Sequence, residues 1–358
     1  GGHSLLAMRL INKIRDQLNK EISLRVLFEC ADVKAIADVL DTEHELTSLP
    51  EIQAVSDKDK CVLSSYAQQR LYFLDALNEG QAQYNMPVNL AVSGVLDLAR
   101  LEAVIQVIIA RHETLRTTYT ENKGEVYLSI QSAPEQFKIE QYEIQNLSDQ
   151  AQQNKVNLLL EQEARKPFDL SNDLMIRAMY LKTSSSTGVL CLNMHHIATD
   201  GWSMELLVKE LFTLYRASSD AVVDLPELAV QYSDYALWQR TYLNDSTLDK
   251  QLAYWQTQLD ALPTLHGLPI RSESRPSVKG SSGAILKSHL NRDVKLALES
   301  TSAAYRLTPF MLMQAALALV LSRHSNSDDI VIGTPVANRR DAALDNIIGF
   351  FVNTLVLR

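Results

Sequence analysis

Cysteine, long apolar runs and excess positive charge are all scarce in this sequence. The three cysteines, Cys30, Cys61 and Cys191, lie far apart in a chain of 358 residues. An odd number at such spacing predicts neither a disulfide framework nor a CxxC metal site, and it fits a reducing, cytoplasmic compartment. We find no run of about 18 apolar residues that would predict a membrane-spanning helix, and no signal-peptide pattern.

The charge balance is acidic. Asp and Glu outnumber Lys and Arg by 43 to 34, which gives a formal net charge of −9. This balance argues against a general binder of nucleic acid or of anionic membranes, because such proteins attract polyanions with positive charge. Hydrophobic residues make up 46% of the chain, enough for a sizeable core, and the length predicts two or three folded units.

The apolar pattern divides the chain into segments. Residues 1–42 carry apolar residues at helical spacing, whereas residues 43–60 show no regular period and contain Pro50, so we expect a linker there. Residues 61–228 and 229–358 alternate strand and helix patterns and predict an α/β architecture with two lobes. Because the chain lacks an initiator Met and closes on a strand-like alternation, we expect a fragment whose second lobe is truncated.

Short patterns predict several turns and element ends. Asn122-Lys123-Gly124 lies between two alternating runs and predicts a hairpin. Thr308-Pro309 predicts a helix start, since Thr caps helices and Pro suits their first turn. Ile330–Ile332 predicts a short buried strand that ends at Gly333-Thr334-Pro335.

One stretch concentrates ionisable residues at the end of an apolar run. Val189–Met194 predicts a buried strand, and a helical pattern starts at Ser203. Strand-to-helix turns of this kind commonly carry functional groups in α/β folds. Between the two elements lie two histidines, a carboxylate and a glycine: His195, His196, Asp200 and Gly201.

Four interpretations of this turn can be weighed. A metal site is disfavoured, because adjacent residues of a strand point to opposite faces, so His195 and His196 do not reach one ion together. A nucleophilic Ser203 lacks a GxSxG elbow, and we interpret Ser203 as the helix cap. A histidine acting on an attacking amine is chemically reasonable, because free imidazole and α-amino groups have pKa values of about 6.5 and 7.7–8.0. A satisfied polar turn without chemistry stays open beside it.

The residues of this turn also resemble a motif of a known protein family. His195–Gly201 resembles the H-H-x-x-x-D-G signature of the condensation domains of nonribosomal peptide synthetases. One such signature is moderately specific, whereas six motifs in the family's order are very specific. Five other segments resemble further motifs of that family, in the same order along the chain: Ser64–Leu71, Arg111–Thr117, Tyr232–Gln239, Ile332–Arg339 and Gly349–Thr354.

The opening residues resemble a second family. Gly1-Gly2-His3-Ser4-Leu5 is similar to the attachment motif of a peptidyl carrier domain, whose serine carries 4′-phosphopantetheine. The resemblance makes Ser4 the attachment residue, although a serine at a helix start is otherwise interpreted as an N-cap. Residues 1–42 are then expected to be the last part of an all-α carrier helical bundle.

The resemblance implies a fold, a reaction and partners. Condensation domains have two chloramphenicol-acetyltransferase-like lobes with a tunnel between them. Donor and acceptor carrier domains bring a donor acyl or peptidyl thioester and an acceptor aminoacyl thioester, and the acceptor amine attacks the donor to form an amide. Neighbouring adenylation domains and a phosphopantetheinyl transferase are the other implied partners, with no nucleic acid and no membrane.

The resemblance also assigns roles to residues. His196 matches the family's functional second histidine, while His195 and Asp200 match residues with structural roles. Asp200 is expected to pair with Arg70 or Arg339, both in family motifs, and the sequence does not choose between them. Whether His196 is a base or positions the amine also stays open. We expect the glycine that follows Asp200 to let the backbone turn and approach closely.

Subtypes of the family can be ranked. A heterocyclisation domain would carry aspartates in place of the histidines, so that subtype is disfavoured. An epimerisation domain shares the H-H-x-x-x-D-G signature, but its carrier usually reads G-G-D-S, and His3 stands in the third place here. We therefore expect peptide-bond formation. Because no epimerisation domain separates the carrier motif from the condensation motifs, we expect an L-configured donor, and a D-accepting subtype stays open. The alternatives are an epimerisation domain and a non-catalytic module that docks carriers.

Overall fold

The computed structural model describes most of the chain from Pro50 onward and parts of the segment before it. Ser4 and its motif lie outside the described residues, and so does most of the expected linker. The described residues are 10, 11, 13, 14, 17, 18, 20, 22, 26, 27, 30, 32–42, 50–55, 62–77, 82–217, 225–263, 267–269, 285–305 and 307–358.

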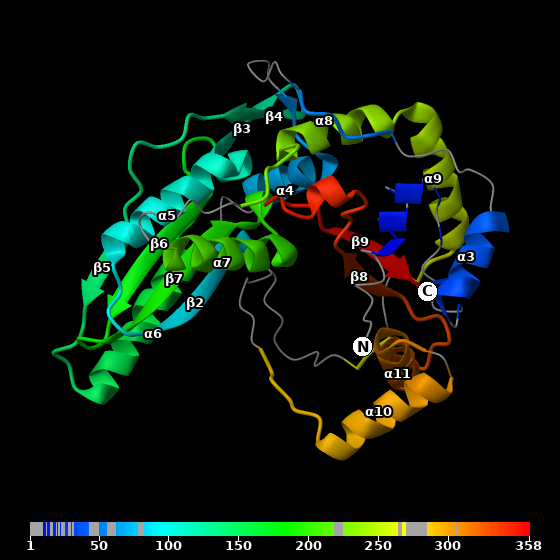
Figure 1. Ribbon diagram of the computed structural model, residues 1–358. Helices are drawn as coiled ribbons and strands as arrows, with labels where there is room; N and C mark the ends of the chain where they lie inside the picture. The colour runs from blue at the N-terminus through cyan, green and yellow to red at the C-terminus, as the bar shows by residue number, and fades with distance from the viewer. Residues whose placement is uncertain are drawn as a thin grey trace.

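Two groups of elements are visible in Figure 1, one on each side of the molecule. The first is a four-stranded sheet with three helices, and its strands follow the order β2-β7-β6-β5. Only the β5–β6 pair is parallel within this sheet. The strands are β2 (Asn85–Ser93), β5 (Glu140–Glu143), β6 (Ile176–Lys182) and β7 (Thr187–His195); the helices are α5 (Leu98–Arg111), α6 (Asp149–Arg165) and α7 (Gly201–Arg216).

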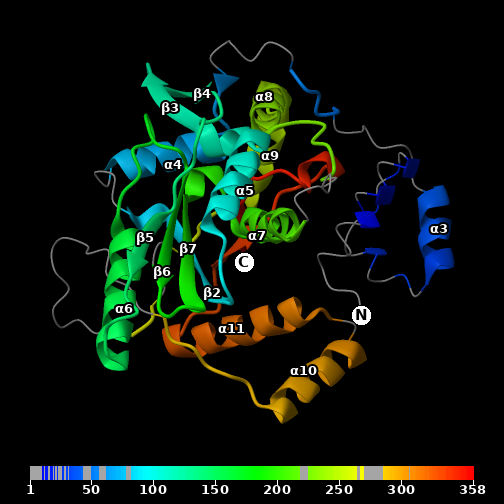
Figure 2. The same cartoon turned by 60° about the vertical axis from the view of Figure 1, so that its left-hand side comes forward.

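Strand alternation sends the two faces of this sheet to different helices. Leu190, Leu192 and Met194 of β7 lie in one cluster with residues of α5 and α7. Cys191, between them, packs with Val156 of α6 in another cluster. Figure 2 shows α5 and α7 on one side of the sheet and α6 on the other. The two-residue period of a strand therefore decides which side chains of β7 face which layer.

A smaller sheet and a helix cover one end of this lobe. The strand order is β1-β4-β3, and both pairs are antiparallel. The expected hairpin is confirmed: Lys123 and Gly124 both have positive φ, 54° and 85°, as the tight turn between β3 and β4 requires. The elements are β1 (Val62–Leu63), α4 (Tyr66–Leu77), β3 (Thr117–Asn122) and β4 (Glu125–Ile130), with short 3₁₀ turns at Ala82–Tyr84 and Glu113–Arg116.

The second group of elements contains four helices and one antiparallel strand pair, β8–β9. The expected helix start is confirmed, since Thr308 Oγ1 accepts a hydrogen bond from the Met311 N–H at 3.2 Å. The elements are α8 (Tyr232–Tyr242), α9 (Asp245–Gln258), α10 (Arg292–Ala304), α11 (Pro309–Ser325), β8 (Ile332–Val336), a 3₁₀ turn at Ala342–Leu344 and β9 (Asn353–Leu357).

The short buried strand expected at Ile330–Ile332 begins two residues later, at Ile332, and its residues are partly buried or exposed. β8 begins at Ile332 and runs through Gly333 and Pro335, the residues that were expected to end it. Among the described strands, β8 pairs only with β9, so one edge of β8 needs no N–H from Pro335. A strand with such an edge tolerates a proline that a central strand would exclude.

Two further features concern the helices of the second group. α10 and α11 keep large apolar side chains at the surface, among them Leu296, Phe310 and Leu319. No single helix in the described part of the chain is long and apolar enough to cross a membrane, although α10 and α11, bent by 107°, pass that test when counted together.

The described part of residues 1–42 is helical, as the periodicity predicts. It ends with α3 (Val33–Thr42), and five residues with little exposure form a small separate core. A helical unit of this size and composition agrees with the expected carrier fragment. The core residues are Ile11, Ile14, Ile22, Leu27 and Leu40.

Candidate active site

The two adjacent histidines end β7 and begin a 3₁₀ turn, and the alternation of the strand separates them. His195 is the last residue of β7 and is 2% exposed, on the same side as Cys191. His196 opens the 3₁₀ turn His196–Ala198 and is only partly buried. The expectation that the two rings have different environments is therefore met.

The His195 side chain is buried among residues of the described chain. Its Nε2 lies 3.8 Å from Asp75 Oδ1, and its Nδ1 accepts a hydrogen bond from the Ile197 N–H at 3.2 Å. The rings of Tyr84 and Phe168 meet it edge-on, with centroids 6.2 and 5.8 Å away. A ring enclosed in this way shapes the turn and is not available to a substrate.

His196 is held by its own turn and keeps one ring nitrogen free of that turn. Its Nδ1 lies 2.6 Å from the carbonyl oxygen of Thr199. The ring of Phe350 packs edge-on against it, with centroids 4.8 Å apart. Because a carbonyl oxygen only accepts hydrogen bonds, Nδ1 carries a proton, and in the neutral ring Nε2 carries the lone pair.

Asp200 is a fully buried carboxylate that joins three segments. Its Oδ1 accepts a hydrogen bond from the Ser203 N–H at 2.8 Å and caps α7, while its Oδ2 accepts from the Phe351 N–H at 3.1 Å. Arg339, 5% exposed, places a guanidinium nitrogen 3.4 Å from Oδ1. Burial lowers the pKa of Arg339 and the charge of Asp200 opposes this, so the pair is a buried ion pair.

The choice left open between two arginines is thereby resolved by geometry. Arg70 lies on the exposed side of α4, whereas Asp200 has no exposed surface. Arg339 also donates to the carbonyl oxygens of Leu344 and Ile347, and its guanidinium lies 4.0 Å from the centre of the Phe351 ring. Arg339 is therefore the partner of Asp200.

Ser203 was expected to cap α7, but the observed cap is Asp200, and Ser203 has a different role. Ser203 is buried in the first turn of α7, where its Oγ donates to the Gly349 carbonyl oxygen at 2.9 Å and accepts from the Gly349 N–H at 3.0 Å. Its Oγ also accepts from Arg339 at 2.7 Å. The loop that carries Phe350 is therefore tied to α7 by a side chain.

Glycine is required at position 349 and not at position 201. A Cβ on Gly349 would lie 2.0 Å from Cδ2 of Tyr232, a contact that no real atom pair tolerates. Gly201 has neither a positive φ nor any atom within 4 Å of such a Cβ. A Cβ at position 201 would therefore meet open space, so no contact within the described part of this chain requires glycine there, and the close backbone approach expected at Gly201 stays a prediction.

A buried amide connects the turn to the first motif. Gln68 of α4 is fully buried and donates to the Ile197 carbonyl oxygen at 3.2 Å and to the Tyr119 hydroxyl at 3.0 Å. Ser65 pairs with the Tyr232 hydroxyl at 2.9 Å, and Tyr232 donates to the Phe350 carbonyl oxygen at 2.6 Å. Hydrogen bonds thus support both sides of His196.

A second buried histidine lies behind the Gly349–Phe350 loop. His112 has no exposed surface; its Nε2 donates to Glu210 at 2.9 Å, and its Nδ1 accepts from the Ile348 N–H at 3.4 Å. An accepting Nδ1 means a neutral ring. Burial, with the nearby charges of Arg111 and Arg339, lowers the pKa of His112 in spite of Glu210, which agrees with that state.

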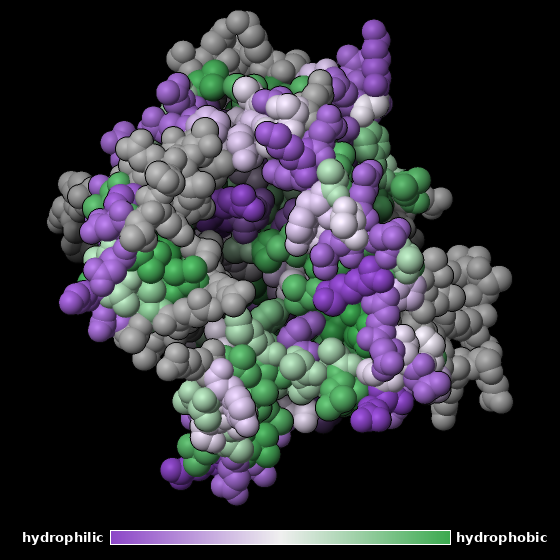
Figure 3. All heavy atoms as spheres, turned by 90° about the vertical axis from the view of Figure 1, so that its right-hand side faces the viewer, coloured by the Kyte–Doolittle hydropathy of each residue, from purple (hydrophilic) through white to green (hydrophobic). Residues whose placement is uncertain are grey.

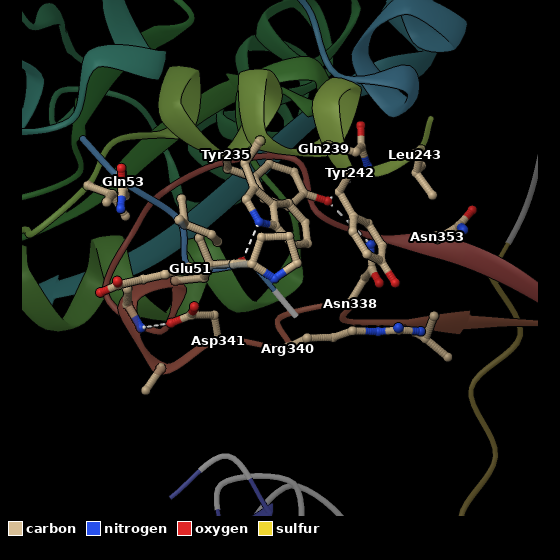
Figure 4. Close-up of a pocket in the computed structure, with 18 of the residues that line it drawn as sticks. Glu51, Gln53, Tyr235, Gln239, Tyr242, Leu243, Asn338, Arg340, Asp341 and Asn353 are labelled. Carbon is tan, nitrogen blue, oxygen red and sulfur yellow. Dashed lines mark hydrogen bonds between the residues drawn. The ribbon is translucent and has the colours of Figure 1, made fainter. Parts of the chain in front are cut away.

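A large hollow lies away from the histidines, between α8, α9 and the β8–β9 pair. It measures about 1420 Å³ and is walled by aromatic residues that include Tyr235, Trp238 and Tyr254. Figure 3 shows hydrophobic side chains around a hollow on the face that carries α9, and Figure 4 shows Tyr235 and Tyr242 on one wall with Arg340 opposite. His196 is not among the residues that line it.

Among the described residues, the structure brings four of the expected residues together and leaves one of the two arginines outside the site. His195, His196, Asp200 and Arg339 converge, Arg70 is exposed, and Ser4 lies outside the described residues. The sequence analysis assigned no role in the site to three members of these motifs, Gln68, Tyr232 and Phe350, and it interpreted Ser203 only as a helix cap. A glutamine that interrupts an apolar helix face was a usable signal for Gln68.

We expect Asp200→Ala to lower the free energy of unfolding by about 3–5 kcal/mol, because it leaves the Arg339 guanidinium buried without its counter-charge. Arg339→Leu should have an effect of similar size, and the double variant should lose less than the sum of the two. Urea denaturation followed by tryptophan fluorescence measures this. The exposed Asp328 provides the control Asp328→Ala, and equal small losses for all variants would contradict the buried pair.

Acid should destabilise the protein through His112. Its pKa is lowered on folding, so below about pH 6.5, where an unfolded histidine binds a proton, the unfolded state binds more protons than the native state. Stability should therefore fall with decreasing pH by up to about 1.4 kcal/mol per unit. His112→Gln should flatten this part of the pH profile, the exposed His324→Gln should not, and identical slopes would contradict the assignment.

Comparison with known proteins shows the family of the chain. The condensation-domain family matches residues 58–358, and the phosphopantetheine attachment site matches residues 1–40. All of the chain aligns with a linear gramicidin synthase of Brevibacillus parabrevis at 36% identity, and with a probable non-canonical nonribosomal peptide synthetase of Salinispora arenicola at 39%. The chain spans only 7% and 4% of the lengths of these two proteins.

A solved structure shows the same architecture. The X-domain from teicoplanin biosynthesis matches with a TM-score of 0.76 and 27% identity, over 86% of this chain and 67% of that domain. The first condensation domain of the CDA synthetase, at 19% identity and a TM-score of 0.69, shows the likeness of fold alone. The chain therefore belongs to the condensation-domain family, in its chloramphenicol-acetyltransferase-like fold over residues 58–358, and its residues 1–40 match a phosphopantetheine attachment site.

Proposed function

We propose that the chain forms peptide bonds in nonribosomal peptide synthesis, with an acceptor aminoacyl amine attacking a donor acyl thioester beside His196. The observation that carries the proposal is the hydrogen bond from His196 Nδ1 to the Thr199 carbonyl oxygen at 2.6 Å. It leaves Nε2 of a partly exposed ring to meet the amine, whereas His195 is enclosed.

His196 acts on the proton of the attacking amine. As the new C–N bond forms and the donor C–S bond breaks, Nε2 takes the proton that the amine loses and returns it to the departing sulfur. The positive ring that exists between these events is stabilised by the Thr199 carbonyl oxygen at Nδ1. Phe350 packs against the ring and limits its rotation. Orientation of the amine and proton transfer are both served by this arrangement.

The fixed turn explains why the buried network serves the reaction. Gln68 donates a hydrogen bond to the Ile197 carbonyl oxygen, next to His196 in the chain. Asp200, paired with Arg339, accepts from the Phe351 N–H and fixes the loop whose Phe350 ring contacts His196. A catalytic group held by its neighbours loses little entropy when the substrates arrive. We infer that these residues position His196 and do not themselves touch the reacting atoms.

Ser4 is the residue we propose for the attachment of phosphopantetheine. A serine hydroxyl forms the phosphate ester that such an arm needs, and the phosphopantetheine attachment-site family matches residues 1–40, which include Ser4. When bound, the group supplies a flexible arm that carries acyl groups as thioesters. The partners proposed with it are donor and acceptor carrier domains, neighbouring adenylation domains and a phosphopantetheinyl transferase.

An L-configured donor is the subtype that we propose. Its support is sequence order: the attachment motif is followed by the linker and the condensation motifs, with no epimerisation domain between them.

His196→Ala should lower the rate of amide formation by about 10²–10⁴-fold, the usual contribution of a positioned general base. The assay uses the full-length polypeptide with loaded donor and acceptor carriers and follows product by mass spectrometry, with L- and D-aminoacyl donors run in parallel. His196→Asn keeps a donor for the Thr199 carbonyl and removes Nε2, so it should be equally slow, while His324→Ala should be unaffected. Unchanged turnover in His196→Asn would sink the role assigned to Nε2.

Incubation of the full-length polypeptide with a phosphopantetheinyl transferase and coenzyme A should add one phosphopantetheine to the peptide that contains Ser4. Intact-mass measurement and peptide mapping locate the addition. Ser4→Ala should abolish it, whereas the matched change Ser23→Ala, in the same segment, should not. Modification that persists in Ser4→Ala would place the attachment elsewhere.

A further inference from the structure

The segment between the carrier fragment and the condensation domain is not a free linker where the structure describes it. Pro50–Val55 adopts no helix or strand, yet it lies against α8. The Trp238 indole N–H donates to the Pro50 carbonyl oxygen at 2.6 Å, and the Val55 N–H donates to Asp234 Oδ1 at 3.0 Å. The two ends of the segment are therefore bound to side chains of one helix.

Asp234 and Trp238 are well placed on α8 to bind both ends of the segment Pro50–Val55. Asp234 and Trp238 are four residues apart, so they lie on the same face of the helix, one turn from each other. Asp234 is 2% exposed and also accepts from the Gln231 N–H at 2.7 Å, so its carboxylate is already fixed by the helix start. A fixed, buried carboxylate makes a strong acceptor for a single backbone N–H.

The middle of the segment is anchored by burial. Ile52 is 6% exposed, while its neighbours Glu51 and Gln53 are exposed. Ile52 packs in a cluster that contains Tyr232 and Phe351. Both residues belong to the network around Asp200, because Tyr232 donates to the Phe350 carbonyl oxygen and the Phe351 N–H donates to Asp200. The anchor is thus one layer of side chains away from the histidine site.

Docking of this segment places a fixed point of the condensation domain closer, along the chain, to the carrier fragment. Thr42, the end of α3, is eight peptide bonds from Pro50, whereas it is twenty peptide bonds from Val62, the start of β1. For a flexible chain these lengths give root-mean-square reaches of about 16 and about 25 Å. The effective concentration of a tethered group falls as the −3/2 power of tether length, which makes the docked form about fourfold more concentrated.

We propose that Pro50–Val55 is a docking strap, held by Asp234 and Trp238 and anchored by Ile52, which positions the phosphopantetheine-bearing domain for delivery of its donor to His196. This inference rests on the proposed function for its delivery step, while the docking of the strap stands independently of it. Asp234 and Trp238 are positioning residues, since they act on the carrier through the strap and touch no substrate. Figure 4 shows Glu51 and Gln53 of the strap beside Tyr235 of α8.

Two variants of the full-length polypeptide detach the strap in different ways. Ile52→Ser removes the apolar anchor. Trp238→Phe removes the N–H that holds Pro50 but keeps one aromatic ring to stack between Tyr235 and Tyr242. Gln53→Ala, at the exposed position next to the anchor, is the matched control. Hydrogen exchange of the peptide that contains Val55 reports docking without any activity.

We expect the Val55 amide to be protected in the wild type and in Gln53→Ala, and to exchange at least tenfold faster in Ile52→Ser. Transfer from a donor loaded on Ser4 of the same chain should then slow about fourfold, while transfer from a separate carrier added in excess should not change. Trp238→Phe should move both readouts in the same direction. This split between tethered and separate donors is not expected from a variant that merely loosens the fold.

Three outcomes would overturn the inference or part of it. A wild-type Val55 amide that exchanges as fast as an exposed one would show that no strap is docked. Faster exchange with an unchanged tethered rate would show that the strap is docked but does not position the carrier. A wild type that makes no amide with either kind of donor would remove the proposed function and the delivery step with it, and the exchange at Val55 would still decide whether the strap exists.

Discussion

The buried carboxylate of Asp200 is the constraint on which the rest of the site depends. A carboxylate without exposed surface is costly unless it is paired and hydrogen-bonded, and Asp200 meets this requirement only through partners that come from three places. The first turn of α7, the backbone at Phe351 and the guanidinium of Arg339 must all be present at once. Folding of the first lobe and closure of the loop at residues 339–351 are therefore coupled through one charge.

The position of His196 follows from that coupling. Strand alternation turns His195 toward Asp75, Tyr84 and Phe168. His196 begins the 3₁₀ turn, where the Thr199 carbonyl determines which ring nitrogen is protonated. Phe350 can pack against the ring only because Asp200 and Ser203 hold the loop on which it lies. The histidine is accordingly the exposed end of a rigid, buried network.

The same network reaches the segment that joins the carrier fragment to the condensation domain. Ile52 and Phe351 share a hydrophobic cluster, and Phe351 is also one of the partners of Asp200. The hydrophobic cluster that packs around Phe351 therefore also contains Ile52, the anchor of the strap. Physical continuity between a tether and a catalytic loop is useful to a protein whose substrate is proposed to arrive on a covalent arm.

The sequence by itself determined the elements and the different environments of the two histidines in the turn. Strand and helix periods predicted β7 and α7, Lys123-Gly124 predicted the hairpin, and opposite strand faces predicted different roles for His195 and His196, because these features depend on neighbouring residues. Only the tertiary structure decided that Asp200 pairs with Arg339, that Ser203 ties down Gly349 and that β8 runs through a proline. Each of these depends on a partner or a free edge far along the chain, and local patterns contain no information about which distant groups will be buried together.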